Sequence, residues 1–280
     1  MKTDFFLGLN PNGFHKIAVH EWGDAGSSGV PVICVHGLGR TGRDFDRLAE
    51  RLASQSAVYC PDMPGRGQSD NLPDAEDYTF TQYMNDLTVL IARTGVAQVD
   101  FVGTSMGGLL GMMLAALPHN PIRRLVINDV GPTVPQAALD RLKTYLTLDL
   151  PLFDDFDAYE QFLRKVNAAF GSLSDADWHH MARVIYRRTP EGKITWPYDP
   201  KILLGVQKNA EINLWSAYDA IKCPTLLIHG AKSDLLPDDM VKEMLSRGPR
   251  PKLYTVEDAG HAPMLMDEVH ADAIRDFLEG

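Results

Sequence analysis

The chain has 280 residues, of which 45% are hydrophobic and 23% charged, and its formal net charge is −10. A chain of this size can bury a large apolar core without disulfides or metals. Its acidity, without any basic run, argues against nucleic acid as a partner, because clustered Lys and Arg bind phosphate backbones.

The three cysteines, Cys34, Cys60 and Cys223, lie in or beside apolar runs and lack metal-ligand spacing. We therefore expect buried thiols, with neither a disulfide framework nor a zinc or other metal site. The N-terminus has no signal-peptide pattern, and no apolar run is long enough to span a bilayer. The default expectation is a protein of the reducing cytoplasm that acts away from membranes.

The first half of the chain alternates between short β-like runs and amphipathic helices. Apolar or alternating runs predict strands at residues 3–9, 14–23, 30–35, 57–60, 99–103 and 122–128. Helical periodicity predicts helices at about 43–54 and 79–93, and another beginning near 106. This alternation indicates a mostly parallel, doubly wound sheet with helices on both faces.

The β rhythm stops at Gly131-Pro132, and the residues that follow read as helical. We predict a helical lid over residues 131–221, inserted after the sixth strand. Aromatic residues such as Phe162, Phe170 and Trp196 recur in it. A small lid has little interior, so several of these aromatic side chains are expected to face the site beneath.

The β rhythm resumes at residues 224–229 and 252–256, with a helix predicted at 238–247. A closing helix is predicted from Ala262 or Pro263 to Leu278, because proline suits the first helical turn. The core domain is therefore expected to comprise residues 1–130 and 222–280.

The segment from Gly103 to Gly107 reads Gly-Thr-Ser-Met-Gly and fits the G-x-S-x-G nucleophile elbow. The chain must turn from strand to helix within one or two residues to lift the Ser105 hydroxyl clear of the sheet. A Cβ at either glycine is expected to collide with the neighbouring strand or helix. The helix that begins near Met106 then directs unpaired N–H groups at negative charge beside Ser105.

A serine nucleophile needs a base to take its proton and an acid to orient that base. Asp234 lies in the loop after the 224–229 strand, and His261 lies in the loop after the 252–256 strand. This is the chain order that accompanies a nucleophile elbow. The carboxyl ends of parallel strands share one sheet edge, so Ser105, Asp234 and His261 can converge.

Together these motifs resemble those of the α/β-hydrolase superfamily, in its lidded branch of esterases, lactonases and carbon–carbon bond hydrolases. The resemblance covers most of residues 14–130 and 222–279. It rests on His36-Gly37, the loop of residues 62–70, the elbow at 103–108, Gly230 to Asp234, and Gly260-His261. It implies an α/β-hydrolase fold with an eight-stranded, mostly parallel sheet and a helical lid after strand six.

The resemblance also implies a role for each residue. Ser105 is the expected nucleophile, His261 the general base and Asp234 the orienting acid. Asp129, directly after the sixth strand, is the alternative acid, since some members of this superfamily carry it there. The expected oxyanion hole consists of the backbone N–H groups of Leu38 and Met106.

Three further residues lie close to the expected oxyanion loop. His36 is expected to brace this loop rather than react. Arg40 and Arg43 lie just past it, where each could bind a substrate carboxylate or simply belong to a solvated helix start.

The sequence therefore predicts cofactor-independent hydrolysis of a carboxylic ester of a small to medium, partly apolar substrate, through an acyl-enzyme. Three alternatives remain: a carbon–carbon bond hydrolase of ring-fission products, a lactonase, and a ligand-binding receptor on a hydrolase scaffold. The substrate is expected to be a small molecule. Its identity and the oligomeric state are left open, because specificity depends on the lid and pocket walls.

Overall fold

The computed structural model describes residues 1–24, 29–138, 140, 149–204 and 212–280. Its core is an eight-stranded sheet in the order β1-β2-β4-β3-β5-β6-β9-β10. The strands are β1 (Lys2–Asn10), β2 (Gly13–Trp22), β3 (Val32–Val35), β4 (Val58–Pro61), β5 (Val99–Thr104), β6 (Ile122–Asn128), β9 (Thr225–Gly230) and β10 (Lys252–Val256). β1 and β2 are antiparallel to their neighbours, and the strands from β4 onward pair in parallel. The predicted eight-stranded, mostly parallel sheet is confirmed.

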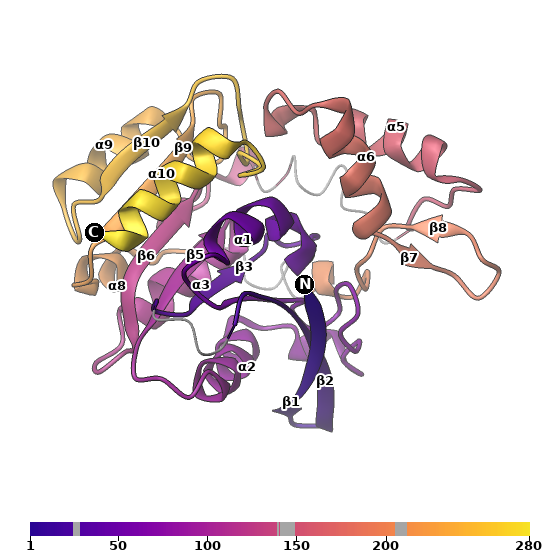
Figure 1. Ribbon diagram of the computed structural model, residues 1–280, viewed down its shortest axis with the longest axis horizontal. Coiled ribbons are helices and arrows are strands. Elements are labelled where there is room, and N and C mark those ends of the chain that lie inside the picture. Colours follow the sequence, from indigo (N-terminus) through magenta and orange to yellow (C-terminus); the bar gives the residue numbers. More distant parts are fainter. Residues whose placement is uncertain (25–28, 139, 141–148, 205–211) are drawn as a thin grey trace.

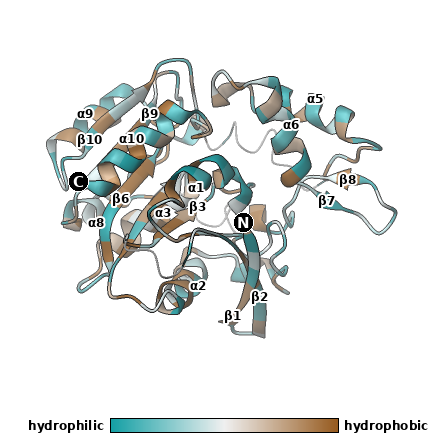
Figure 2. Ribbon diagram, in the orientation of Figure 1, coloured by the Kyte–Doolittle hydropathy of each residue, from teal (hydrophilic) through white to brown (hydrophobic). Residues whose placement is uncertain are grey.

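Helices cover both faces of this sheet. On one face α1 (Asp46–Leu52), preceded by the short η1 (Gly42–Phe45), packs with α10 (Glu268–Glu279). The other face is covered by α2 (Phe80–Arg93), α3 (Met106–Ala115) and α9 (Asp238–Ser246), with η2 (Ala75–Asp77) before α2. Figure 2 shows the hydrophobic residues concentrated in the central strands and on the inner faces of these helices. The sheet is therefore buried on both sides, as the continuous apolar runs predict.

The elements between β6 and β9 lie in the range where a lid is predicted. Those that the structure describes are α5 (Phe156–Val166), η3 (Ala168–Phe170), α6 (Asp175–Val184), the hairpin strands β7 (Arg187–Arg188) and β8 (Ile194–Thr195), and α8 (Trp215–Ala220). In Figure 1, α5, α6, β7 and β8 lie together to one side of the sheet. The range expected for the lid also contains residues 139, 141–148 and 205–211, which lie outside the described residues.

The segment predicted to form a helical lid differs from that expectation in two ways. β7 and β8 form a small antiparallel hairpin. α8 packs against α3 of the core, and its fully buried Tyr218 donates its hydroxyl to the Met244 carbonyl of α9 at 2.8 Å. The boundary of the lid at residue 221 stays a prediction.

The predicted start of the closing helix at Ala262 or Pro263 is wrong. α10 begins at Glu268, and Asp267 caps it by accepting a hydrogen bond from the Val269 N–H. Residues 262–266 are instead non-helical and buried, with Leu265 in the core on the α10 side of the sheet. Burial of this apolar segment therefore prevailed over the helix-start preference of Pro263.

Among the helices that the structure describes, none has both the length and the apolar character needed to cross a membrane.

Candidate active site

Ser105 lies at the tight turn between β5 and α3, with φ 54° and ψ −114°. A Cβ on Gly103 would lie 2.2 Å from the Gly107 carbonyl oxygen, and one on Gly107 would lie 2.0 Å from the Val35 carbonyl oxygen. Both contacts are too short for any side chain. The glycines therefore permit the close strand and helix approach that holds Ser105 at the sheet edge.

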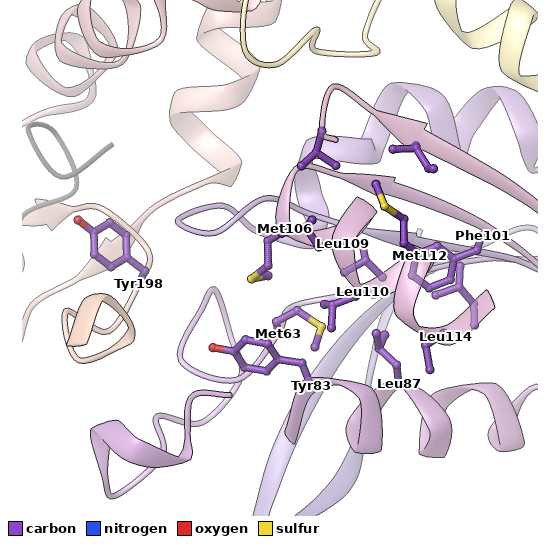
Figure 3. Close-up of a cluster of buried hydrophobic side chains, with 14 of the residues drawn as sticks. Met63, Tyr83, Leu87, Phe101, Met106, Leu109, Leu110, Met112, Leu114 and Tyr198 are labelled. Carbon is purple, nitrogen blue, oxygen red and sulfur yellow. The ribbon is translucent and has the colours of Figure 1, made fainter. Parts of the chain in front are cut away.

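Beneath the turn, α3 is anchored by apolar packing. Met106, Leu109 and Leu110 are buried, and Figure 3 shows them directed toward the interior where Met63 and Tyr83 also lie. This packing fixes the start of α3, and with it the position of Ser105.

His261, in the loop between β10 and α10, lies between Ser105 and a carboxylate. Its Nε2 is 2.9 Å from the Ser105 Oγ, and its Nδ1 is 2.9 Å from Asp129 Oδ2. Because a carboxylate can only accept, this contact places the ring proton on Nδ1 and leaves Nε2 free to accept the serine proton. The imidazole is buried.

The carboxylate beside His261 thus belongs to Asp129, the alternative acid, and the preference for Asp234 is corrected. Asp129 follows β6 directly, is fully buried, and has a φ of 56°. Asp234 lies four positions beyond the end of β9 on an exposed stretch of its loop. β6 lies between β5 and β9 in the sheet. Asp129 therefore follows the strand next to the one that carries Ser105, whereas Asp234 follows the strand beyond it.

Two supporting residues escaped the sequence analysis. Ser233 donates its hydroxyl to Asp129 Oδ2 at 2.6 Å and accepts the Leu236 N–H at 3.1 Å, while the Gly230 N–H donates to Asp129 Oδ1 at 2.8 Å. Asn128 Nδ2 donates to the Pro263 carbonyl at 2.9 Å, which ties β6 to the loop that carries His261. In the sequence, only their positions point to the site, because Asn128 directly precedes Asp129 and Ser233 directly precedes Asp234.

A cavity of about 90 Å³ adjoins Ser105 and His261. Its core side includes Leu38 and Arg40, and its lid side includes Asn167, Phe170 and Trp196. Phe170 and Trp196 thus line the cavity, whereas Trp178 does not and is buried in the apolar core cluster.

The two residues expected to form the oxyanion hole lie near this cavity. Leu38 lines it, and Met106 opens α3 immediately after Ser105. The first N–H groups of a helix have no acceptor within the helix, so the Met106 N–H is available to a developing anion.

A fully buried arginine joins the segments that carry Leu38 and Met106. Arg66 donates Nε to the Leu38 carbonyl at 2.9 Å and Nη1 to the Tyr83 hydroxyl at 2.7 Å. Its Nη2 lies 3.6 Å from the Met106 Sδ. Sequence reasoning missed Arg66, since an arginine in a Gly-rich loop usually reads as a surface residue.

His36 has the bracing contacts expected of it. Its Nδ1 lies 2.7 Å from the Gly37 carbonyl oxygen, and its Nε2 accepts the Met63 N–H at 3.0 Å. Burial lowers its pKa to about 4, although the Gly37 hydrogen bond opposes the shift. The ring is therefore neutral near pH 7, and it joins the loop after β3 to the loop after β4.

The two arginines considered as substrate contacts lie in different surroundings. Arg40 lines the Ser105 cavity and pairs with Asp44 through Nε and Nη2, at 2.8 and 2.6 Å. Arg43 pairs with Asp46 at 2.6 Å and lines a separate depression instead. The structure thus brings Arg40, and not Arg43, to Ser105.

Asp46 also joins α1 to α6. His180 Nε2 of α6 lies 2.9 Å from Asp46 Oδ2. Burial raises the pKa of Asp46, but hydrogen bonds from His180 and Arg43 outweigh it and hold the pKa below its ordinary value.

The sequence model of the alpha/beta hydrolase family matches residues 32–276, which is most of the chain. The chain belongs to the alpha/beta hydrolase family. This hydrolase is 40% identical over 290 aligned residues to the 3-hydroxybutyrate-oligomer hydrolase of Cupriavidus necator, covering 100% of this chain and 98% of the relative.

Solved structures agree with this assignment. A protein from Rickettsia typhi matches this hydrolase with a TM-score of 0.92 at 31% identity, over 100% of this chain and 99% of the other. An alpha/beta hydrolase from Novosphingobium aromaticivorans matches with a TM-score of 0.86 at 33% identity, over 99% and 98%. The family and the fold implied by the elbow and loop motifs are therefore confirmed.

Proposed function

We propose that this hydrolase cleaves carboxylic esters through an acyl-enzyme on Ser105. The observation that supports this most directly is the position of His261. Its Nε2 lies 2.9 Å from the Ser105 Oγ, and its Nδ1 lies 2.9 Å from Asp129 Oδ2. That arrangement lets one imidazole take the serine proton while a carboxylate supports the resulting positive charge.

In the first half of the reaction, Ser105 Oγ attacks the ester carbonyl carbon as His261 Nε2 takes its proton. The carbonyl oxygen becomes an oxyanion, which the N–H groups of Leu38 and Met106 stabilise. The carbon–oxygen bond to the alcohol then breaks, and His261 returns the proton to the departing oxygen. Water repeats the sequence on the acyl-enzyme, which releases the acid and restores Ser105.

The proposed substrates are esters of short, partly apolar acids, and oligomers of 3-hydroxybutyrate are the first to be tried. The relative from Cupriavidus necator is named for hydrolysis of such oligomers. The cavity beside Ser105, at about 90 Å³, suits an acyl group of this length.

The decisive experiment measures hydrolysis of 4-nitrophenyl acetate and butyrate, and of 3-hydroxybutyrate dimer and trimer, by the wild-type protein and Ser105→Ala. We expect wild-type turnover and a fall in kcat of at least about 10⁴-fold in the variant, because the nucleophile is lost. Thermal melting checks that the variant is folded.

Retained turnover in folded Ser105→Ala would reject the acyl-enzyme mechanism. Lactones and a ring-fission dienoate belong in the same panel, since exclusive turnover of either would replace ester hydrolysis with lactonase or carbon–carbon hydrolase activity. Binding of a substrate analogue without turnover of any compound would support a receptor instead.

A further inference from the structure

Two polar side chains of the lid remain unpaired at the Ser105 cavity. Asn167 and Trp196 both line it, and they are 5% and 2% exposed. Within the described part of the chain, neither Asn167 Nδ2 nor Trp196 Nε1 has a hydrogen-bond partner, and both atoms are shielded from solvent. Buried polar groups in folded proteins are nearly always paired, so unpaired donors on two residues that line one cavity need an explanation.

Both side chains sit on firmly placed segments. The Trp196 ring, directly after β8, packs edge-on against Phe162 at 5.3 Å and tilted against Tyr198 at 5.7 Å between ring centroids. Asn167 ends α5, where its N–H donates to the Leu163 carbonyl at 2.9 Å and its carbonyl accepts the Phe170 N–H at 3.0 Å. This packing restricts how far either donor can turn to find a partner within the protein.

The same segment of the lid is joined to the loop that carries His261. The Ala169 carbonyl accepts the Gly260 N–H at 2.7 Å. Ala169 lies two residues after Asn167, and Gly260 directly precedes His261. Asn167 is therefore held in a fixed relation to the proposed catalytic base, as a group that orients substrate must be.

The charge on the cavity wall indicates which kind of acceptor these donors suit. Arg40 and Asp44 both line the cavity, and they form a two-point ion pair at 2.8 and 2.6 Å. The positive charge thus faces a carboxylate directly, while Val166, Phe170 and Met264 make the remaining wall apolar. A wall of balanced charge with two neutral N–H donors fits a neutral oxygen better than a second carboxylate.

We propose that Asn167 and Trp196 form a subsite for a second, neutral oxygen acceptor of the substrate, separate from the carbonyl that Ser105 attacks. The substrates it selects are esters that carry a further hydroxyl, ether or ester oxygen, as hydroxy-acid esters do. This inference rests on the proposed ester hydrolysis and adds the residues that determine which esters are preferred.

The test compares esters in pairs of equal size. One pair varies the acyl half, 4-nitrophenyl 3-hydroxybutyrate against 4-nitrophenyl 3-methylbutyrate. Another varies the alcohol half, 2-methoxyethyl butyrate against butyl butyrate. A third pair, mono-4-nitrophenyl glutarate and 4-nitrophenyl 5-oxohexanoate, sets a terminal carboxylate against a neutral ketone oxygen.

The variants are Trp196→Phe, which keeps an aromatic ring but removes the indole N–H, and Asn167→Leu, which removes the amide at similar size. Trp178→Phe is the matched control, because Trp178 is a buried lid tryptophan that does not line the cavity. The measured quantity is the ratio of kcat/KM between the two members of a pair. Loss of folded protein lowers both values equally and cancels in this ratio.

We expect the wild-type ratio to favour the oxygenated member by about tenfold or more in at least one of the first two pairs. Trp196→Phe and Asn167→Leu should each bring that ratio toward one, whereas Trp178→Phe should leave it as in the wild type. In the third pair the ketone should be preferred over the carboxylate.

Three results would overturn the subsite while leaving ester hydrolysis in place. They are equal wild-type kcat/KM within both of the first two pairs, an unchanged ratio in both subsite variants, or the same loss of ratio in Trp178→Phe. A wild-type preference for the carboxylate would overturn the neutral acceptor. If the wild type hydrolyses no ester at all, the proposed function fails and the subsite fails with it.

Discussion

At the scale of single residues, Asp129 and Asp234 differ in what surrounds each carboxyl group. The Asp129 carboxylate is fully buried and accepts hydrogen bonds from the Gly230 N–H, the Ser233 hydroxyl and His261 Nδ1. Asp234, one residue after Ser233, lies on the exposed side of the same loop. A buried carboxylate with fixed donors can hold one imidazole orientation, which an exposed side chain cannot do as firmly.

Asp129→Asn is therefore expected to lower kcat for 4-nitrophenyl butyrate by about 10⁴-fold, by analogy with other serine hydrolases whose orienting acid is replaced. The amide can donate its own N–H toward His261 and so favours the wrong tautomer. Asp234→Asn is the matched control, and its kcat should stay within about twofold of the wild type. A larger loss in Asp234→Asn than in Asp129→Asn would contradict the assignment of Asp129.

At the scale of elements, the proposed oxyanion hole depends on two segments that are far apart in the chain. Leu38 lies after β3, and Met106 begins α3. Arg66, in the loop after β4, contacts the Leu38 carbonyl and the Met106 sulfur from the interior. It also packs against the rings of Tyr78 and Tyr83. One buried guanidinium therefore bridges the two segments whose N–H groups form the proposed oxyanion hole.

Replacing Arg66 by Met should lower kcat by about 10- to 100-fold with little change in KM, since a shift of about 1 Å in a catalytic group can cost 10²-fold. The melting temperature should also fall, because buried carbonyls lose their donor. Arg123→Met serves as the control. Arg123 pairs with Asp100 at 2.6 Å and does not line the Ser105 cavity.

Arg123→Met should therefore lower the melting temperature while leaving kcat near the wild-type value. Equal kcat losses in the two arginine variants would show that general destabilisation, and not the position of the oxyanion groups, explains the effect of Arg66.

At the scale of the whole molecule, loops after neighbouring strands and a segment of the lid meet above one edge of the sheet. His36 joins the loops after β3 and β4, and Asn128 joins β6 to the His261 loop. From the lid, the Ser172 N–H donates to Asp258 at 2.8 Å, close to His261. The site is thus part of the folded core, and its geometry depends on the stability of the fold.

This dependence predicts how stability changes with pH. The pKa of His36 falls from the ordinary 6.5 to about 4 in the folded protein. Between pH 6.5 and about 4, His36 is therefore protonated in the unfolded chain but neutral in the folded chain. The contribution of His36 to the free energy of unfolding is fully present above pH 6.5. It is lost as the pH falls from 6.5 toward 4, by about 3 kcal/mol in total.

Denaturant unfolding of the wild type and His36→Gln at intervals between pH 7 and 4 measures this contribution. Glutamine does not titrate, so the free energy of unfolding should fall less steeply for His36→Gln than for the wild type over this range. Carboxylates titrate in both proteins and cancel in the comparison. Parallel curves would contradict the proposed burial of a neutral His36.

The sequence by itself determined the features that depend on local chain geometry. The glycines around Ser105 are required wherever a strand turns into a helix at such close range, and the 2.0 Å approach to Val35 shows why. The apolar runs predicted the buried strands because a strand covered on both faces must be apolar throughout. These patterns were sufficient for the fold, the elbow and the loop that carries His261.

Only the tertiary structure decided which side chains meet. Asp129 and Asp234 follow neighbouring strands, β6 and β9, so both were compatible with the sheet edge. Burial and the donors of the β9 loop place Asp129 beside His261. Arg66, Asn167 and Trp196 carry no local signal, since their contacts lie across loops and the lid. A sequence pattern gives the spacing of residues along the chain, whereas contacts between side chains depend on their distances in the folded protein.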